Sequence, residues 1–278
     1  MRRVILSLLI CLCGFSTEVF AASALTTKLG SIESLTPSFY QQKRRAEPTA
    51  LREVGQLKAH KDELMELARS DFRTVVWEEP GVDLEARLTA LREAVYITLG
   101  RWGGNEVETF LLTELRQELL SDSSERAILR GLGSMKLKLD TQRELLSRVG
   151  AQSANPTTRF DTLMVLARQG SSVAINAYEE ERVAKVLRPL EVVRIGAQLT
   201  VAVALQSGSW PDLIWTKVVA SSAQVQSTTF AAEALWQTLQ ALSQDFRKLA
   251  LETVLREGTP ELAQSISRRA RWADRRNR

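Results

Sequence analysis

The sequence has few of the residues on which thiolate and imidazole chemistry depend. Its 278 residues include two cysteines, Cys11 and Cys13, and one histidine, His60. Both cysteines lie near the N-terminus, so the chain beyond residue 21 contains no cysteine at all. A disulfide framework, a thiolate zinc site and a cysteine- or histidine-based catalytic triad are therefore excluded for that part of the chain. We predict that apolar packing alone holds it together.

Sequence motifs of common enzyme classes are also missing. The Gly-x-Ser-x-Gly pattern does not occur, and no serine is followed three residues later by lysine. The stretch from Gly131 to Ser134 is rich in glycine, but no strand is predicted before it. We therefore interpret this stretch as a close contact between helices rather than as a phosphate-binding loop.

Two acidic runs, Glu78-Glu79 and Glu179 to Glu181, offer paired carboxylates. Two carboxylates serve as acid and base in glycoside hydrolysis. The Gly-Leu-Met-Gln stretch that accompanies the catalytic glutamate of soluble lytic transglycosylases does not occur here. We interpret the second run as the solvated face of a helix, with Arg182 and Lys185 as partners within that helix. We therefore predict no enzymatic activity, no metal site and no cofactor.

The first 21 residues have the pattern of a secretory signal. Arg2 and Arg3 precede an apolar run over residues 4–15, and small side chains follow at Val19 and Ala21, as a signal peptidase requires. A membrane-spanning helix needs roughly 20 apolar residues, so this run is too short to be an uncleaved anchor. We predict cleavage after Ala21 and a periplasmic or secreted mature chain.

Four similar segments recur along the middle of the chain. Each begins with an arginine and continues as an apolar helical stretch that ends in a large residue followed by a small one. The arginines are Arg92, Arg126, Arg159 and Arg194, at intervals of 34, 33 and 35 residues. A fifth copy without the arginine starts at Phe230. Self-similarity at this period predicts helix pairs that stack on their neighbours, because no single pair can bury its own apolar face.

The boundaries of these helices are indicated by local signals. Second helices are predicted over residues 106–120, 141–149, 173–186, 211–220 and 246–256. Helix starts are indicated at Asp122-x-x-Glu125, Ser209-x-x-Asp212, Asn155-Pro156 and Thr259-Pro260. Helix ends are indicated at Gly103-Gly104, Gly170 and Gly208. Before the repeats, apolar spacing predicts one amphipathic helix over residues 49–70, opened by Pro48. Strands and helices do not alternate, which excludes an α/β fold.

This arrangement resembles the HEAT-like family of α-solenoids, whose repeats carry an arginine on the buried side of a helix and a small residue near its end. The resemblance covers residues 83–258 and implies an all-α fold, a right-handed α-solenoid of about five helix pairs. Tetratricopeptide repeats have a similar period, but in their motif Leu-Gly comes early in the first helix. Here Leu99-Gly100 and Leu132-Gly133 come late, and no tyrosine follows. A tetratricopeptide-like or an irregular helical domain remains the alternative.

The C-terminal segment combines apolar residues with a high positive charge. Leu262, Ile266 and Ala270 share one helical face. Around and beyond this face lie the residues that we predict to contact an anionic partner: Arg268, Arg269, Arg271, Trp272, Arg275 and Arg276. Lipid headgroups, lipopolysaccharide phosphates or an acidic protein patch suit an exported chain better than nucleic acid does.

The tryptophans of the helical region fall into two groups. Trp215 and Trp236 occupy apolar helical positions, which predicts that they pack in the core. Trp102 and Trp210 lie beside turn glycines, and we predict them to be exposed anchors for a partner.

These observations divide the chain into five parts. They are a secretory signal over residues 1–21, a poorly ordered lead-in over 22–47, an N-terminal helix and connector over 48–82, the helical repeats over 83–258, and a C-terminal helix with an arginine-rich tail over 259–278. We predict an exported scaffold or adaptor that binds another envelope or secreted protein, with a possible anionic membrane contact through its tail. The alternatives are an envelope or peptidoglycan-processing enzyme or its accessory factor, and a cytoplasmic solenoid that binds nucleic acid through the basic tail.

Overall fold

The computed structural model describes residues 25–32, 35, 43–75, 77, 84–117, 120–151 and 155–276. The predicted signal over residues 1–21 and the acidic pair Glu78-Glu79 lie outside these residues. Every regular element in the described part of the chain is helical and none is a strand, which confirms the all-α class. Within the same part, no helix combines the length and the hydrophobicity that crossing a membrane requires.

The chain forms two compact units, residues 1–135 and residues 136–278. The division falls between α7 (Asp122–Leu132) and α8 (Leu139–Ala151). The sequence pattern assigns these two helices to one repeat, so the boundary between the units cuts through a predicted helix pair.

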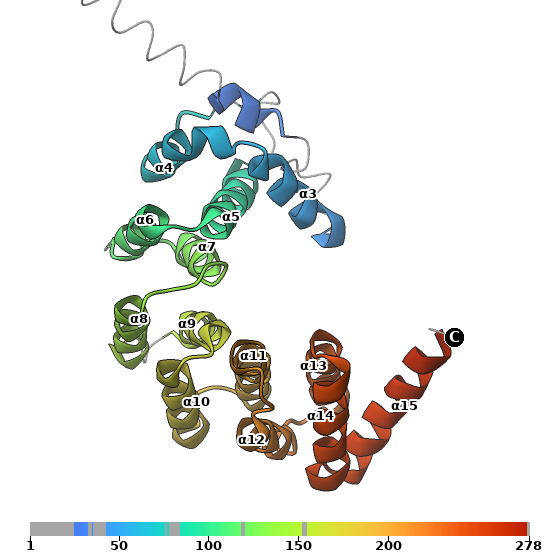
Figure 1. The fold of residues 1–278 in the computed structure, drawn as a ribbon. Coiled ribbons are helices and arrows are strands. Elements are labelled where there is room, and N and C mark those ends of the chain that lie inside the picture. The colour runs from blue at the N-terminus through green and yellow to red at the C-terminus, as the bar shows by residue number, and fades with distance from the viewer. Residues whose placement is uncertain are drawn as a thin grey trace, which may run out of the picture. The chain divides into compact units, whose positions relative to one another are not determined.

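The first unit is organised around α5 (Leu84–Trp102), which contacts α3, α4, α6 and α7 (Figure 1). The bounds of the helices that contact or precede it are α3 (Lys43–Gly55), the 3-10 helix η2 (Lys58–His60), α4 (Lys61–Arg69) and α6 (Asn105–Leu115), and a further short helix covers residues 25–30. The prediction of a single helix over residues 49–70 is therefore wrong, because α3 ends at Gly55, a poor helix former, and α4 begins at Lys61. Helix α3 also begins before Pro48, at Lys43, where lysine, arginine, alanine and glutamate favour helix formation.

The backbones of α5 and α7 approach each other closely at two glycines. A Cβ atom at Gly100 would overlap the carbonyl oxygen of Gly131, and one at Gly131 would lie 2.6 Å from the carbonyl oxygen of Tyr96. Only residues without a side chain allow this approach. The interpretation of the glycines near residue 131 as a close contact between helices is thus confirmed.

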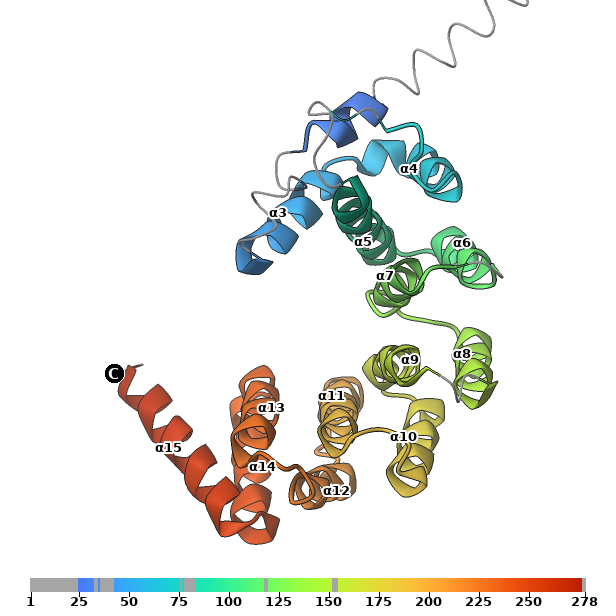
Figure 2. The same ribbon diagram turned by 180° about the vertical axis from the view of Figure 1, so that it is seen from behind.

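The second unit packs its helices on their neighbours in sequence. Figures 1 and 2 show α9, α11 and α13 side by side in one row, and α11 also contacts α12, which contacts α14. The bounds are α9 (Pro156–Gln169), α10 (Ser172–Ala184), α11 (Pro189–Ser207), α12 (Asp212–Ser222), α13 (Thr228–Ala241), α14 (Gln244–Glu257) and α15 (Pro260–Arg276). Trp215 is fully buried, as predicted, and its Nε1 donates to the carbonyl oxygen of Ala250 at 3.0 Å, which ties α12 to α14.

Most of the predicted helix boundaries are confirmed. Asn155 accepts from the amides of Thr157 and Thr158 ahead of Pro156, and Gly170 and Gly208 end their helices in the left-handed conformation.

Two predicted caps are wrong, because neighbouring residues take their place. The cap of α7 is Ser121, whose Oγ accepts from the amide of Ser124 at 3.2 Å, and not Asp122. At α12 the cap position belongs to Pro211, while Ser209 bonds to Ser207 in the preceding turn.

The four repeat arginines lie in different environments. Arg92 is buried and Arg159 nearly so, and both pair with carboxylates, whereas Arg126 and Arg194 are exposed. The HEAT-like resemblance implies that each of these arginines is buried, and this prediction is wrong for Arg126 and Arg194. A buried guanidinium requires a carboxylate beside it, because an unpaired buried charge is too costly.

The acidic run on α10 is not uniformly solvated. Glu181 is buried and pairs with Arg159, so the prediction of a solvated face is wrong at this residue. Glu179 does pair with Arg182 as predicted, at 3.2 Å, and it also accepts from Lys217 Nζ at 2.7 Å. The run therefore serves structural ion pairs within the second unit.

Candidate functional site

Among the hollows in the described part of the chain that combine charged and aromatic side chains, two are candidate sites. One lies between α13 and α15 in the second unit, and it includes residues that the sequence singled out. The other lies among α4, α5, α6 and α7 in the first unit, and no sequence motif indicated it. They are described separately.

The last helix is fixed to the second unit by a short apolar face. Thr259 Oγ1 accepts from the amide of Leu262 at 3.3 Å, which caps α15 ahead of Pro260. Leu262 and Ile266 are buried, and α15 packs on α13 and α14. Burying this face leaves the arginines of α15 on the remaining faces.

A pocket of about 320 Å³ lies between α13 and α15, and we call it the C-terminal pocket. It is lined by Trp236, Gln240, Arg268, Arg269, Trp272 and Ala273. Trp272 is 63% exposed, and Arg268 is exposed as well. Arg269 is held in place by an ion pair with Glu233 of α13. The pocket therefore presents two indole rings and two guanidinium groups on one side of α15.

The structure brings together three of the predicted anionic-partner contacts, Arg268, Arg269 and Trp272. Arg271 is exposed outside the pocket, where its Nε donates to the carbonyl oxygen of Ser267 at 3.4 Å. Arg275 and Arg276 lie in the last turn of α15, and their side chains are outside the described part of the structure.

Sequence reasoning missed the contribution of α13 to the pocket. Trp236, predicted to be core, is half-buried, because α15 covers only part of the ring and leaves the rest to line the pocket. Glu233, Trp236 and Gln240 are spaced three and four residues apart, so they share one face of α13. That spacing could have indicated a common surface, but not that α15 lies against it.

The predicted aromatic anchors are less accessible than expected. Trp210 is half-buried, and its ring lies 6.0 Å from the rings of both Trp215 and Phe246. Its Nε1 is buried and has no hydrogen-bond partner among the described residues. Trp102 is half-buried at the end of α5. Trp210 therefore extends the core that joins α12 and α14, and the prediction of an exposed anchor is wrong for it, because the turn before α12 folds back onto α14.

The hollow in the first unit is a polar cleft of about 490 Å³, and we call it the unit-1 cleft. Its charged lining residues are Arg69, Asp71, Arg73, Glu85, Arg92 and Glu114, and Tyr96 and Gln117 add hydrogen-bonding groups. They come from the end of α4 and the turn after it, from α5 and from the end of α6, and Ser121 and Ser124 at the start of α7 complete the wall.

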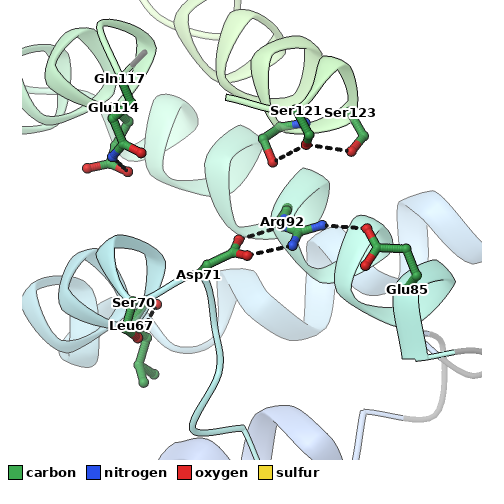
Figure 3. A network of polar contacts seen from close by, with 10 residues as sticks. Leu67, Ser70, Asp71, Glu85, Arg92, Glu114, Gln117, Ser121 and Ser123 are labelled. Carbon is green, nitrogen blue, oxygen red and sulfur yellow. Dashed lines mark hydrogen bonds and ion pairs between the residues drawn. The ribbon is translucent and has the colours of Figure 1, made fainter. Parts of the chain in front are cut away.

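A bidentate ion pair forms one wall of the unit-1 cleft. Arg92 donates through Nε and Nη2 to the two carboxylate oxygens of Asp71, both at 2.8 Å, and through Nη1 to Glu85 at 3.1 Å (Figure 3). The hydrogen bonds to Asp71 raise the pKa of Arg92. Asp71 has φ 55°, a left-handed conformation that is uncommon for a residue other than glycine. The paired guanidinium holds this turn against α5.

Two buried groups face the same cleft without a charged partner. Glu114 is 4% exposed, and its hydrogen bond comes from Gln117 Nε2 at 2.8 Å (Figure 3). Burial raises the pKa of Glu114, and the nearby Arg69 offsets part of this rise. Tyr96 is also 4% exposed, and burial raises the pKa of its hydroxyl well above the ordinary range. Its ring is fixed between Phe72 and Phe110, at centroid distances of 6.4 and 6.3 Å.

Sequence reasoning missed the unit-1 cleft completely. Its residues are spread from position 71 to position 124 and match no motif, because turns and helix ends that are distant in the chain supply them. The C-terminal pocket and the unit-1 cleft also differ in chemistry, since the first is aromatic and cationic and the second is polar, with guanidinium and carboxylate groups in equal number. Searches of protein-family models, of curated proteins and of solved structures found no match to this chain.

Proposed function

We propose that the chain is an exported, HEAT-like α-solenoid that acts as a protein-binding adaptor of the cell envelope. The C-terminal pocket then holds an acidic segment of the partner protein. The signal pattern in the first 21 residues supports export, and the packing of each helix on its neighbours supports a repeat architecture. The observation that carries the proposal is the meeting of Trp236, Trp272, Arg268 and Arg269 in one pocket.

Tryptophan and arginine are the residues that most often dominate binding energy at protein interfaces, each contributing about 2 kcal/mol or more at such hot spots. In the C-terminal pocket the two indole rings provide an apolar surface for one large side chain of a partner. Arg268 is free to adopt the planar, two-bonded geometry with a carboxylate that guanidinium favours. An apolar residue flanked by acids matches this combination.

The net charge of α15 also favours an acidic partner. The helix carries five arginines against Glu261 and Asp274, while Arg269 is already paired with Glu233. The positive electrostatic field of these arginines accelerates the encounter with negatively charged partners and repels positively charged ones. The pocket would then select, among acidic surfaces, those that present an apolar side chain.

The test uses the mature chain and a fluorescent peptide in which one phenylalanine is flanked by aspartates and glutamates. A peptide with lysines in place of the acids serves as the negative probe. We expect micromolar or tighter binding of the acidic peptide, weakened at least about tenfold in Trp272→Ala and Arg268→Glu, a loss of roughly 1.4 kcal/mol. Fluorescence anisotropy measures the dissociation constants.

Arg271→Glu is the matched control, because it makes the same charge change on the same helix outside the pocket. Equal losses in Arg271→Glu and Arg268→Glu would mean that net charge alone attracts the peptide. Vesicles of anionic phospholipid form a second arm of the experiment. Binding to vesicles without binding to the peptide would replace the protein partner by a membrane surface.

A further inference from the structure

An acidic segment ahead of α5 is not used by the proposed function, and we call residues 74–86 the acidic connector. It contains Glu78, Glu79, Asp83 and Glu85 and neither lysine nor arginine, so its formal charge is −4. No other interval between successive lysines or arginines of the chain holds as many acidic residues. The acidic connector is therefore the natural counterpart, within this chain, of a positively charged surface.

One apolar side chain of the acidic connector is exposed at the start of α5. Leu84 is 53% exposed, and it lies between Asp83 and Glu85 in the sequence. Among the exposed large apolar side chains of the described residues, Leu84 alone has an acidic residue on both sides. An apolar side chain flanked by acids is the feature that the C-terminal pocket is proposed to recognise.

Contacts within the first unit hold the described ends of the acidic connector. The guanidinium of Arg87 lies over the ring of Trp77, 5.6 Å from its centroid. Glu85 accepts a hydrogen bond from Arg92 at 3.1 Å and keeps its side chain 72% exposed. Ends that are already fixed lose less conformational entropy when the segment binds a partner.

The C-terminal pocket offers the complementary surface in the second unit. The residues that line it all belong to α13 and α15, and α15 carries five arginines against two acids. Complementary charges of this kind speed the encounter of two proteins and suppress wrong partners. Because the acidic connector belongs to the first unit, each chain carries two different surfaces that can pair with those of another copy.

We propose that the acidic connector of one copy of this chain docks in the C-terminal pocket of a second copy. The Leu84 side chain then packs on the two indole rings, and a neighbouring carboxylate pairs with Arg268. This inference rests on the proposed binding of acidic segments by the pocket, and it names the chain itself as a partner. A contact between two different surfaces leaves one of each unused, so further copies add head to tail.

Light scattering of the mature chain during size-exclusion chromatography tests for this association. We expect the average mass to rise with protein concentration between about 1 and 100 μM at low salt, as micromolar contacts require. Raising the salt from about 0.05 M to about 0.5 M should return the mass toward that of one chain, because salt screens exposed charges. A mass of one chain at every concentration in low salt overturns the proposal.

Two variants that each lose one side of the contact establish its geometry. Trp272→Ala disables the pocket, and Glu78→Gln combined with Glu79→Gln and Leu84→Ser disables the connector. We expect each variant alone to remain a single chain. Their equimolar mixture should form a complex of two chains and no larger, because only one intact connector and one intact pocket can meet. Absence of a complex in the mixture, or growth beyond two chains, contradicts docking of the connector in the pocket.

The apolar side chain is tested by itself with Leu84→Ser, which we expect to weaken self-association at least about tenfold. Leu139→Ser is the matched control, because Leu139 is also the first residue of its helix, α8, and is 52% exposed. This control should associate as the unmodified chain does, and thermal unfolding confirms that both variants are folded. Equal losses in the two variants overturn the role of Leu84.

A fluorescent peptide of residues 74–86 with blocked ends separates this inference from the proposed function. We expect the mature chain to bind it, and Trp272→Ala to bind it at least about tenfold more weakly. Binding of the acidic model peptide without binding of the 74–86 peptide overturns self-association and leaves the proposed function standing. Failure of both peptides overturns both. If the connector variant binds the peptide more tightly than an unmodified chain that stays a single chain, the pocket is filled by its own chain, which overturns docking between copies.

Discussion

Replacing Gly131 by alanine tests the close crossing of α5 and α7. A Cβ atom at this position would lie 2.6 Å from the carbonyl oxygen of Tyr96 and 3.3 Å from Leu111 Cδ1. The oxygen belongs to the backbone of α5, which cannot rotate away as a side chain can, so the two helices must separate. Overpacking a close-packed interior costs about 1–3 kcal/mol, and a backbone obstacle puts this change at the upper end.

The higher helix propensity of alanine opposes part of this loss. Alanine stabilises a helix interior by about 1 kcal/mol relative to glycine, so we expect Gly131→Ala to lower the free energy of unfolding by about 2 kcal/mol. Gly55 provides the matched control. A Cβ atom there meets nothing within 4 Å, so Gly55→Ala should be neutral or slightly stabilising.

Urea unfolding followed by far-ultraviolet circular dichroism measures the difference. With equal slopes, the shift in midpoint reports the change in free energy of unfolding directly. In a thermal scan, a loss of about 2 kcal/mol corresponds to a Tm lower by roughly 6–10 °C for a unit of this size. Coincident unfolding curves for Gly131→Ala and Gly55→Ala would refute the close approach of the two helix backbones.

Three other outcomes follow from the described contacts and from the N-terminal pattern. Glu181→Gln removes the charge that compensates the nearly buried Arg159 and should lower the free energy of unfolding by about 3 kcal/mol. The partly exposed Glu179→Gln should lower it by less than about 1 kcal/mol, and similar losses for the two variants in urea unfolding would contradict the pairing of Glu181 with Arg159. Because burial raises the pKa of Glu114, the folded state keeps the carboxyl proton to higher pH than the unfolded chain does. The protonated carboxyl therefore stabilises the folded state below the unfolded pKa of about 4.3, and this contribution to the free energy of unfolding is lost as pH rises through the folded pKa. Glu114→Gln should therefore reduce the fall in Tm from about pH 4 to about pH 8. Parallel profiles of Tm against pH for the variant and the unmodified protein would contradict the raised pKa of Glu114. Mass spectrometry of the protein expressed with its complete N-terminus should find a mature chain that begins at Ala22, and an intact Met1 in the cytoplasm would rule out export.

Local signals in the sequence predicted much of the helical framework, because the physics of a helix end is itself local. Asn155 ahead of Pro156 satisfies free amides with its own side chain, and Gly170 adopts a left-handed conformation that other residues avoid. Where two polar residues competed for one cap, as at Ser121 and Asp122, the sequence did not separate them. That choice depends on the direction from which the chain enters the helix.

The environment of a side chain across helices was much less predictable. Arg92 and Arg126 occupy matching places in the repeat, yet one is buried and the other exposed. Helical spacing determines which residues share a face, but the rotation of that face toward the core depends on the neighbouring helices. Asp71 offsets the free-energy cost of burying Arg92, and it lies in a turn outside the repeat pattern. A repeat register therefore predicts where a helix lies, and not the charge balance around it.

The same reasoning explains why one candidate site was partly foreseen and the other was not. The arginines and Trp272 of α15 lie within one helix, so their spacing alone groups them. Tyr96 and Glu114 come from two helices that meet only after folding, and neither residue is unusual in its own segment. What marks them is their burial beside the cleft, and burial exists only in the folded unit. Burial shifts the pKa of such groups, so a site of this kind is found from the folded unit and not from any single segment.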